Sequence, residues 1–425
     1  MRFRWPARIA CAVAAPLMIG GAVIAQTGVA SAAQATHSKT LYVSPSAKSH
    51  GSDRSCGSAA FKTIKSAVAA ARAGSTVVVC AGTYHEQVVL AKPVTLTGHR
   101  ATIDESGVTP GLKVTLPGLG TQTIYAAVIV ASSHVTFQGF TVRHAVGEGL
   151  LAAGLGHVLY GVSVRHNTVV HNDLGSIKLG SPYFECAAEG SVPGDCGEGV
   201  HFTGVAHSAI RDNYISQNSG GTLLSDDTGP THHNVIEGNV VTRNELDCGI
   251  TVPGHNPRAL NSKGVPQPSV AGVYDNVIRH NVVTDNGLKG EGAGVLFANA
   301  GPGTASYNNR VEGNYIANNE LPGVTMHAHT LKPRTFEDLN GNVIVSNAIG
   351  KNNIGGDPLD GPPGPSDKHT TGVLVFSGGT HVHVTIARNV VSDNAIGIWL
   401  SKPVTASGLR TNKFIHVTVP ISAHH

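Results

Sequence analysis

Short apolar pairs alternate with polar residues along most of the chain, and this spacing is typical of β-strands. The clearest stretch runs from Asn234 to Gly254, where Asn239 and Asn244 are five positions apart. Seven segments carry two asparagines at this offset, and their first asparagines are Asn167, Asn213, Asn239, Asn281, Asn314, Asn347 and Asn389. A degenerate copy of the repeat has Gly139 and His144 at the two asparagine positions. The repeat therefore predicts one architecture built from many similar units.

The spacing of the repeat favours a solenoid of strands. Successive first asparagines are 26 to 46 residues apart. Helical repeats can have such periods, but they need amphipathic helices, which these segments lack. Three short strands and three turns per repeat predict a right-handed parallel β-helix of about ten coils, about 50 Å long at about 4.8 Å per coil. Asparagine suits the turns because it tolerates the left-handed conformation, and stacked amides can hydrogen-bond between coils.

The pattern changes to helical spacing near the N-terminus. In FKTIKSAVAAARAG, Phe61, Ile64, Val68 and Ala71 share one face. A helix at 61–73 is expected to cap the stack, because an open end would expose core and unpaired backbone. The expected organisation is a signal peptide at 1–33, a strand and capping helix at 34–75, the β-helix at 76–420 and a tail at 421–425.

The first 33 residues have the features of a signal peptide. Arg2, Arg4 and Arg8 precede an apolar run, and the small residues 30–32 offer a cleavage site. Their removal leaves 27 basic residues against 27 acidic ones. The mature chain thus lacks the basic surplus of a nucleic-acid-binding protein. No other stretch is long and apolar enough to span a bilayer, so we expect a secreted protein.

Export favours disulfide bonds. Cys56 and Cys80 bracket the expected helix, and Cys186 and Cys196 bracket a loop, so we pair them in this way. Cys248 precedes a strand that is expected to be buried, and we expect a packed free thiol there.

The N-terminal segment also resembles a known family. LYVSPSAKSHGSDRSCGSAAFKTIKSAVAAARAGSTVVVCAGTYHEQVVL is similar to the opening of secreted parallel β-helix proteins of the pectate-lyase-like superfamily. The N-x-[VI]-x-x-N coils resemble repeats of its carbohydrate-binding and sugar-hydrolysing members. The resemblance covers nearly the whole mature chain and implies the fold. It leaves the reaction open, because the superfamily includes lyases, hydrolases, epimerases and proteins with no known activity.

Strand alternation assigns the faces of the glycine-led strands. The inward pairs are Val200/Phe202, Ile250/Val252, Val295/Phe297, Val324/Met326 and Val373/Val375. The outward residues, one per coil, are Lys178, His201, Leu223, Thr251, Leu296, Thr325 and Trp399. Two positions before the first asparagines stand Arg165, Arg211, Glu237, Arg279 and Glu312. These charges are expected to form an ion-pair ladder along one face.

Polar residues that can carry chemistry gather at one edge of this pattern. The candidate catalytic residues are Lys178, His201, His255 and Arg258; the candidate substrate contacts are Thr251 and Asn256; and the candidate calcium ligands are Glu198, Asp226 and Asp227. Insertions at 180–197 and 253–272 flank this edge and are expected to wall a groove. His327 and His329 could bind a metal, but no third ligand is fixed by spacing, so we expect exposed turn histidines.

Three functions remain open. A polysaccharide lyase that acts by β-elimination needs a cation to neutralise a uronate carboxylate and a base to remove the neighbouring proton. Calcium suits the first task, and Lys178, His201 or Arg258 could serve as the base. A glycoside hydrolase needs two carboxyl groups about 5–10 Å apart, for which Glu198 with Asp226 is the better-spaced pair. The third function is a non-catalytic glycan-binding rod. We place the lyase first, with a polysaccharide as partner, no nucleic acid, and no expectation about oligomeric state.

Overall fold

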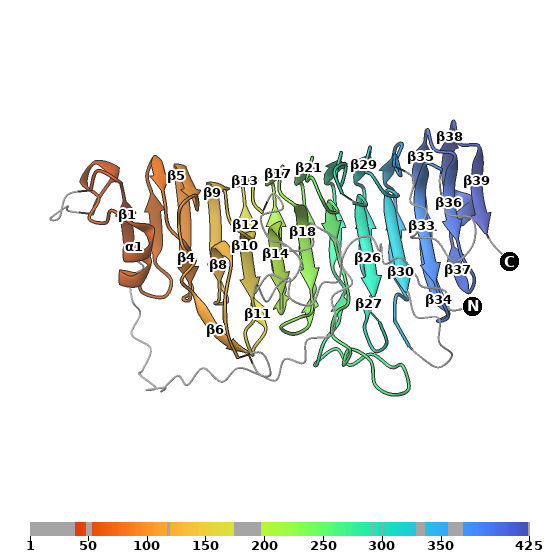
Figure 1. The fold of residues 1–425 in the computed structure, drawn as a ribbon, viewed down its shortest axis with the longest axis horizontal. Helices are drawn as coiled ribbons and strands as arrows, with labels where there is room; N and C mark the ends of the chain where they lie inside the picture. Colours follow the sequence, from red (N-terminus) through yellow and green to blue (C-terminus); the bar gives the residue numbers. More distant parts are fainter. Residues whose placement is uncertain are drawn as a thin grey trace, which may run out of the picture.

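The computed structural model describes residues 39–47, 53–116, 120–173, 197–290, 292–299, 301–328, 336–355 and 369–423. They form a long rod with helix α1 (Ile64–Ala70) at one end and strand β39 (Val419–Ala423) at the other (Figure 1). Nearly all elements are strands that pair in parallel between successive coils. The predicted parallel β-helix is therefore confirmed.

Three parallel sheets run along the rod. The first sheet contains β4 (Val88–Leu90), β8 (Ala126–Val130), β10 (Glu148–Ala153), β14 (Glu198–Thr203), β18 (Gly220–Ser225), β22 (Ile250–Thr251), β26 (Val295–Asn299), β30 (Val324–Ala328), β33 (Thr371–Ser377), β36 (Ile396–Leu400) and β39. A narrow sheet contains β11 (Leu159–Tyr160), β15 (Val205–Ala206), β19 (Thr231–His232), β23 (Val273–Tyr274) and β27 (Ser306–Tyr307).

The third and largest sheet has two rows of strands that the long strands β5 and β9 join. It contains β1 (Thr40–Val43), β2 (Thr76–Val79), β3 (Gly82–Tyr84), β5 (Thr95–Asp104), β9 (Thr136–Arg143), β12 (Ser163–Arg165), β13 (Thr168–Val170), β16 (Ala209–Arg211), β17 (Tyr214–Ser216), β20 (Val235–Glu237), β21 (Val240–Thr242), β24 (Val277–Arg279), β25 (Val282–Thr284), β28 (Arg310–Glu312), β29 (Tyr315–Ala317), β31 (Val343–Val345), β32 (Ala348–Ile349), β34 (Val382–Ala387), β35 (Val390–Ser392), β37 (Val404–Ser407) and β38 (Lys413–Ile415). An antiparallel hairpin of β6 (Lys113–Leu116) and β7 (Gly120–Thr123) lies outside these sheets, and two 3-10 turns are η1 (Cys56–Ser58) and η2 (Leu409–Thr411).

Both predicted asparagine columns are present as hydrogen-bonded ladders. In the column that starts at Asn167, each side-chain nitrogen donates to the side-chain oxygen of the next asparagine at 2.8–3.0 Å, as far as Asn412. The column that starts at Asn172 repeats this at 2.8–3.1 Å as far as Asn352. The structure adds a third column that the sequence analysis missed, five positions earlier, formed by Asn234, Asn276, Asn309 and Asn342. Each ladder saturates buried amides, which would otherwise be costly to bury.

The reason for asparagine at these turns differs from the expected one. The left-handed backbone conformation is adopted by the residue before the asparagine, for example His166, Asp212 and His280, each with φ of 54°. The asparagine is therefore needed for its amide, which bonds both the coil before and the coil after, and not for its tolerance of positive φ.

The glycine that leads each strand of the first sheet is explained by the same ladder. A Cβ atom on Gly199 would lie 2.9 Å from the side-chain nitrogen of Asn218 and 3.0 Å from the carbonyl oxygen of Gly221. A side chain here would push the next coil and the ladder apart, so only glycine allows this close approach.

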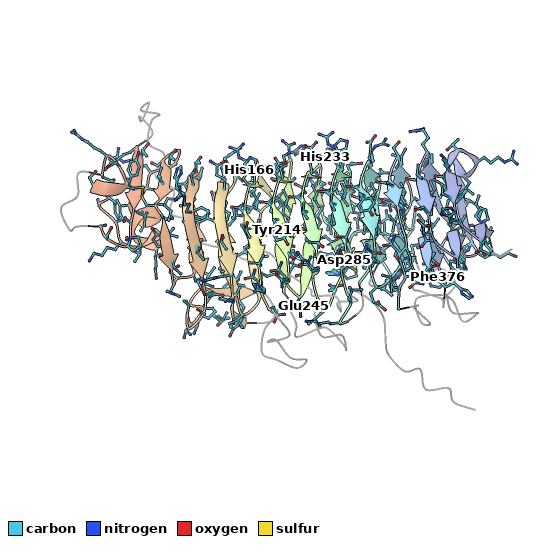
Figure 2. All side chains as sticks on the ribbon, turned by 90° about the horizontal axis from the view of Figure 1, so that it is seen from above. His166, Tyr214, His233, Glu245, Asp285 and Phe376 are labelled. Atoms are coloured by element: carbon cyan, nitrogen blue, oxygen red, sulfur yellow. A yellow bond between two sulfur atoms is a disulfide. The ribbon has the colours of Figure 1, made fainter. Side chains whose placement is uncertain are left out.

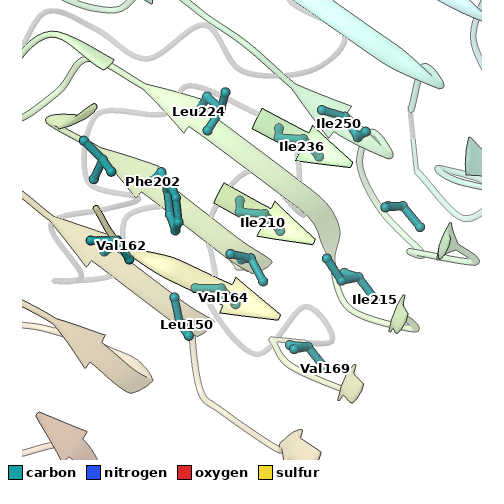
Figure 3. Close-up of a cluster of buried hydrophobic side chains, with 14 of the residues drawn as sticks. Leu150, Val162, Val164, Val169, Phe202, Ile210, Ile215, Leu224, Ile236 and Ile250 are labelled. Atoms are coloured by element: carbon teal, nitrogen blue, oxygen red, sulfur yellow. The ribbon is translucent and has the colours of Figure 1, made fainter. Parts of the chain in front are cut away.

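The inside of the rod is a continuous apolar core (Figure 3). All ten residues predicted to point inward are fully buried: Val200, Phe202, Ile250, Val252, Val295, Phe297, Val324, Met326, Val373 and Val375. At the N-terminal end, α1 places Ile64, Ala67 and Val68 in this core, and Phe61 packs against it. Burial of each large aliphatic side chain contributes about 1.5–3 kcal/mol.

The outer face of the first sheet is covered rather than open. His201, Leu223, Thr251, Leu296, Thr325 and Trp399 lie on this face, as expected, yet none is more than 7% exposed. Leu296 packs with Cys248 and Leu321, and Trp399 packs with Leu374. The expectation of an exposed turn is wrong for His327, because it lies within β30 on this covered face, beside Phe376 of β33.

The predicted ion-pair ladder is confirmed over three coils. Glu237 accepts from Arg211 at 3.3 Å and from Arg279 at 2.8 Å. The ladder does not continue regularly, because Glu312 is bonded at 2.7 Å to Arg310 of its own strand. Arg165 donates instead to Gln138 of the preceding coil.

The disulfide Cys56–Cys80 is present, as predicted. Cys248 is also in a disulfide, so the expected free thiol is wrong. The predicted Cys186–Cys196 pair, the signal peptide, Lys178 and His329 lie outside the described residues.

Strand pairing extends to both ends of the described rod. At the start of the rod β1 pairs with β2, and at its far end β39 pairs with β36 up to Ala423. Within the described part of the chain, no helix is both long and apolar enough to cross a membrane.

Candidate functional site

The acidic pair Asp226-Asp227 directly follows β18, and its two members differ sharply in environment. Asp226 has no exposed surface. One carboxylate oxygen accepts the backbone N–H groups of His255 at 2.7 Å and Asn256 at 3.0 Å, and the other accepts that of Gly272 at 2.7 Å. Burial and then the negative charge of Asp227 raise the pKa of Asp226 to about 6. Asp226 therefore holds the following turn in place.

Asp227 faces the next histidine. Its two carboxylate oxygens accept from the Ser225 hydroxyl at 2.5 Å and from Nδ1 of His255 at 3.0 Å, and its side chain is 23% exposed. Burial alone would raise the pKa of Asp227, but the charge and hydrogen bond of His255, the Ser225 hydroxyl and the charge of His201 together hold it well below its usual range. Asp227 is therefore ionised throughout the neutral range.

The hydrogen bonds continue on the other side of Ser225. Nε2 of His201 is 2.8 Å from the Ser225 oxygen, and Nδ1 of His201 is 2.8 Å from a carboxylate oxygen of Glu148. The second oxygen of Glu148 accepts the backbone N–H of Glu198 at 3.0 Å. One chain of hydrogen bonds thus links Glu148, His201, Ser225, Asp227 and His255 across four successive coils; we call it the carboxylate–histidine chain.

The proton positions in this chain follow from the available donors. Ser225 has one hydroxyl proton, which it gives to Asp227, so its oxygen accepts from Nε2–H of His201. Nδ1 of His201 lies against a Glu148 carboxylate oxygen, so the ring links Glu148 to Ser225. Nδ1 of His255 faces Asp227, so Nε2 is the basic nitrogen whenever the ring is neutral and donates Nδ1–H to this carboxylate.

Glu148 and Ser225 are the members of the carboxylate–histidine chain that the sequence analysis missed. Glu148 starts β10 as Glu198 starts β14, and side-chain ligand atoms of Glu148, Glu198 and His201 lie within 4.8 Å of one another. The usable signal was the repeated Glu-Gly pair that opens two consecutive strands of the first sheet.

Comparison with known proteins bears on the fold. Residues 132–332, just under half of the chain, match the NosD family, described as periplasmic copper-binding protein. No curated protein matches the chain.

Several solved structures are similar over most of the chain. The A-module of Azotobacter vinelandii mannuronan C-5 epimerase AlgE4 is 15% identical, with a TM-score of 0.48, over 85% of this chain and 94% of that one. The alginate lyase from Paenibacillus sp. str. FPU-7 is 13% identical, with a TM-score of 0.48, over 89% and 99%. The Dettilon tailspike protein is 12% identical, with a TM-score of 0.47, over 81% and 62%. Such distant likenesses say nothing about the reaction of this chain.

The architecture itself decides the fold: stacked parallel sheets around one core, with asparagine ladders at the turns. The chain is a parallel β-helix. In this β-helix, the carboxylate–histidine chain lies along the outer face of the first sheet.

The remaining predicted site residues divide into two groups. Thr251 and Asn256 are 1% and 4% exposed, so they are built into the scaffold here, and the side-chain oxygen of Asn256 accepts the backbone N–H of Arg258 at 3.1 Å. Arg258 is exposed, three positions after His255. The turn from 255 to 258 therefore places an imidazole and a guanidinium close together in the sequence.

The carboxylate oxygens of two expected calcium ligands, Asp226 and Asp227, accept hydrogen bonds within the protein. Calcium takes six to eight oxygen ligands. Both carboxylate oxygens of Asp226 are engaged by backbone N–H groups, and both of those of Asp227 are engaged by Ser225 and His255. The expected calcium site at Glu198, Asp226 and Asp227 therefore stays a prediction.

Proposed function

We propose that this protein is an exported polysaccharide lyase that cleaves uronate-containing chains by β-elimination. The Asp227–His255 pair acts as the base, and Arg258 faces the uronate carboxylate. The observation that supports this proposal is the unbroken hydrogen-bond chain from Glu148 to His255, which ends three positions before an exposed guanidinium.

The reaction requires one base and one cation. Nε2 of His255 takes the proton from C5 of the uronate, and the C5–H electron pair forms the C4–C5 double bond as the C4–O bond breaks. The leaving oxygen takes a proton from water. Negative charge grows on the carboxylate next to C5, where the Arg258 guanidinium opposes it. Asp227 keeps the imidazole in the tautomer with a basic Nε2 and stabilises the imidazolium that forms.

The buried end of the carboxylate–histidine chain supports this base. His201 faces Glu148 on one side and Ser225 on the other. Its positive charge helps to keep Asp227 ionised. The chain therefore fixes both the position and the charge of the carboxylate that orients His255.

The hydrolase alternative needs two carboxyl groups that reach the sugar. Asp226 is fully buried and saturated by backbone donors, so it cannot act as an acid toward substrate. Glu148 and Glu198 are each 2% exposed, and Glu148 is bonded to His201 and to backbone. Burial alone does not separate the two functions, because His255 is itself only 5% exposed. We place the lyase first because it needs only one reactive carboxylate–histidine pair.

The test incubates the protein with a panel of uronate and neutral polysaccharides and follows ultraviolet absorbance of unsaturated ends together with reducing ends. His255→Gln is compared with His416→Gln, which alters an exposed His–Asp pair at the far end of the rod, where the two side chains lie 3.1 Å apart. We expect unsaturated product from the wild type and from His416→Gln, and none from His255→Gln. Reducing ends without absorbance would show a hydrolase, and glycan binding without either signal would show a binding protein.

A further inference from the structure

A cluster of three histidines lies on the narrow-sheet side of the rod. His207 follows β15, His232 ends β19 and His233 follows it. Ring nitrogens of all three lie within 4.8 Å of one another, and the Nδ1 atoms of His232 and His233 are only 2.8 Å apart. Figure 2 shows His233 along one long edge of the rod and Phe376 of the first sheet on the opposite side.

We propose that His207, His232 and His233 bind a divalent transition metal ion such as Zn²⁺. Three imidazole nitrogens are a sufficient protein ligand set for zinc, with water in the fourth position. His207 and His233 are exposed, so a water ligand can reach the ion. This site is independent of the proposed lyase activity.

The close contact between His232 and His233 fits a metal-binding pair. Two neutral rings at 2.8 Å share one proton, because only one Nδ1 can donate to the other. A bound ion would replace that proton and widen the separation to about 3.3 Å, which follows from Zn–N bonds of about 2.0–2.1 Å in tetrahedral geometry.

The cluster is held in place before any ion binds. The His232 ring stacks on Tyr274 with centroids 4.7 Å apart, and Tyr274 is fixed by a 2.9 Å hydrogen bond from its hydroxyl to the Pro268 carbonyl and by stacking on Tyr307. His207 stacks on His233 at 4.7 Å. A ligand set that is already ordered loses little entropy on binding.

The backbone on the C-terminal side of the two exposed histidines is fixed as well. Ser208 and Asn234, which follow His207 and His233, donate their N–H groups at 3.0 and 2.9 Å to the asparagine column. Asp275 lies 3.9 Å from Nε2 of His233 and can orient that ring with Nδ1 toward the ion.

The test uses full-length protein without an affinity tag, since added histidines would compete for metal. Equilibrium dialysis with Zn²⁺ alone measures stoichiometry, and Co²⁺ absorption in the visible range reports nitrogen coordination. We expect one equivalent for the wild type and a loss of affinity of more than about 100-fold for the double variant His232→Gln/His233→Gln, because changes in outer partners alone cost about 10–100-fold.

The matched control is His166→Gln. His166 is exposed on the same edge in Figure 2 and has φ of 54°, close to the 55° of His233. It should keep the full equivalent of zinc, and all variants should melt like the wild type because the changed side chains are at least partly exposed. No zinc uptake by the wild type, or an unchanged equivalent in the double variant, would overturn the proposal.

Discussion

Two corners of the rod carry adjacent acidic residues with opposite pKa shifts. After β18, the pKa of Asp226 is raised to about 6 and that of Asp227 is lowered. At the end of β5, the pKa of Asp104 is lowered and that of Glu105 is raised to about 7. The group with the raised pKa is buried in both pairs: Glu105 has one backbone partner, and Asp226 lies beside the charge of Asp227. The group with the lowered pKa, Asp104 or Asp227, is hydrogen-bonded to a histidine.

The difference between the corners lies in what the lowered carboxylate touches. Asp104 bonds to Arg143 and His144, whose side chains are 40% and 43% exposed. Asp227 bonds to His255, which is 6% exposed, and through Ser225 to His201. Two adjacent acidic residues with opposite pKa shifts are therefore not enough to indicate a functional site. A buried histidine that continues the hydrogen bonds distinguishes the corner at Asp227, and this is why we place the reaction there.

The largest expected effect separates the two corners by activity. Asp227→Asn replaces the carboxylate that fixes the His255 tautomer. We expect lyase activity to fall by about 10³-fold or more, because loss of the orienting carboxylate costs about 10⁴-fold in a Ser-His-Asp triad. Asp104→Asn, the matched change at the other corner, should leave activity unchanged. Equal losses in both variants would show that the comparison has no functional meaning.

A second large effect concerns the raised carboxyl of the same corner. Asp226→Ala removes the acceptor of three buried backbone N–H groups, each costing about 1–3 kcal/mol when unsatisfied. We expect the free energy of unfolding to fall by about 3–5 kcal/mol in urea denaturation. Asp227→Asn should lower it by less, because the Asp227 side chain is 23% exposed and the amide keeps an oxygen that can accept a hydrogen bond. If Asp226→Ala were as stable as the wild type, Asp226 would be available for chemistry.

Some features of the fold and of the site could be predicted from the sequence, and others could not. Repetition revealed the strands, two asparagine columns, the inward residues and Cys56–Cys80, because each of these depends on local spacing. The repeat did not distinguish Asp226 from Asp227. The difference arises because the backbone N–H groups of His255 and Gly272, which come later in the chain, donate to the carboxylate of Asp226. Glu148 was missed because its partner His201 is 53 positions away. The cysteine at 248 was misjudged for a similar reason: pairing depends on distant chain segments.

The raised acid of the other corner predicts a pH effect on stability. Glu105 is 1% exposed and accepts one backbone N–H, from Val146 at 3.3 Å. Burial raises its pKa from 4.5 to about 7, so the unfolded chain ionises first and stability falls as pH rises from about 4.5 to 7. Glu105→Gln removes this loss. We expect the variant to match the wild type at pH 4 and to exceed it by about 2–3 kcal/mol at pH 8.

Urea denaturation at both pH values measures this difference. The control is Glu237→Gln, a glutamate whose lowered pKa is caused first by its hydrogen bond from Arg279. It should show no gain at pH 8. A constant offset between Glu105→Gln and the wild type at all pH values would contradict the assignment of the titration to Glu105.

The smallest expected change in stability comes from Asp104, whose pKa is lowered while that of Glu105 is raised. Burial alone would raise its pKa, but hydrogen bonds from Ser106, His144 and Arg143 outweigh it and lower the pKa. A lowered carboxyl stabilises the fold above the unfolded pKa of 3.8, and this contribution is lost as pH falls through the lower folded value. Because both charged partners are about 40% exposed, solvent screens them and the contribution should be about 1 kcal/mol. Asp104→Asn is therefore expected to be about 1 kcal/mol less stable than the wild type at pH 7, with a gap that narrows in acid and in high salt. If the difference in stability between Asp104→Asn and the wild type widened in acid, the pKa of Asp104 would be raised by burial, like that of Glu105. The corner at Asp104 would then lack the pair of opposite pKa shifts on which the comparison rests.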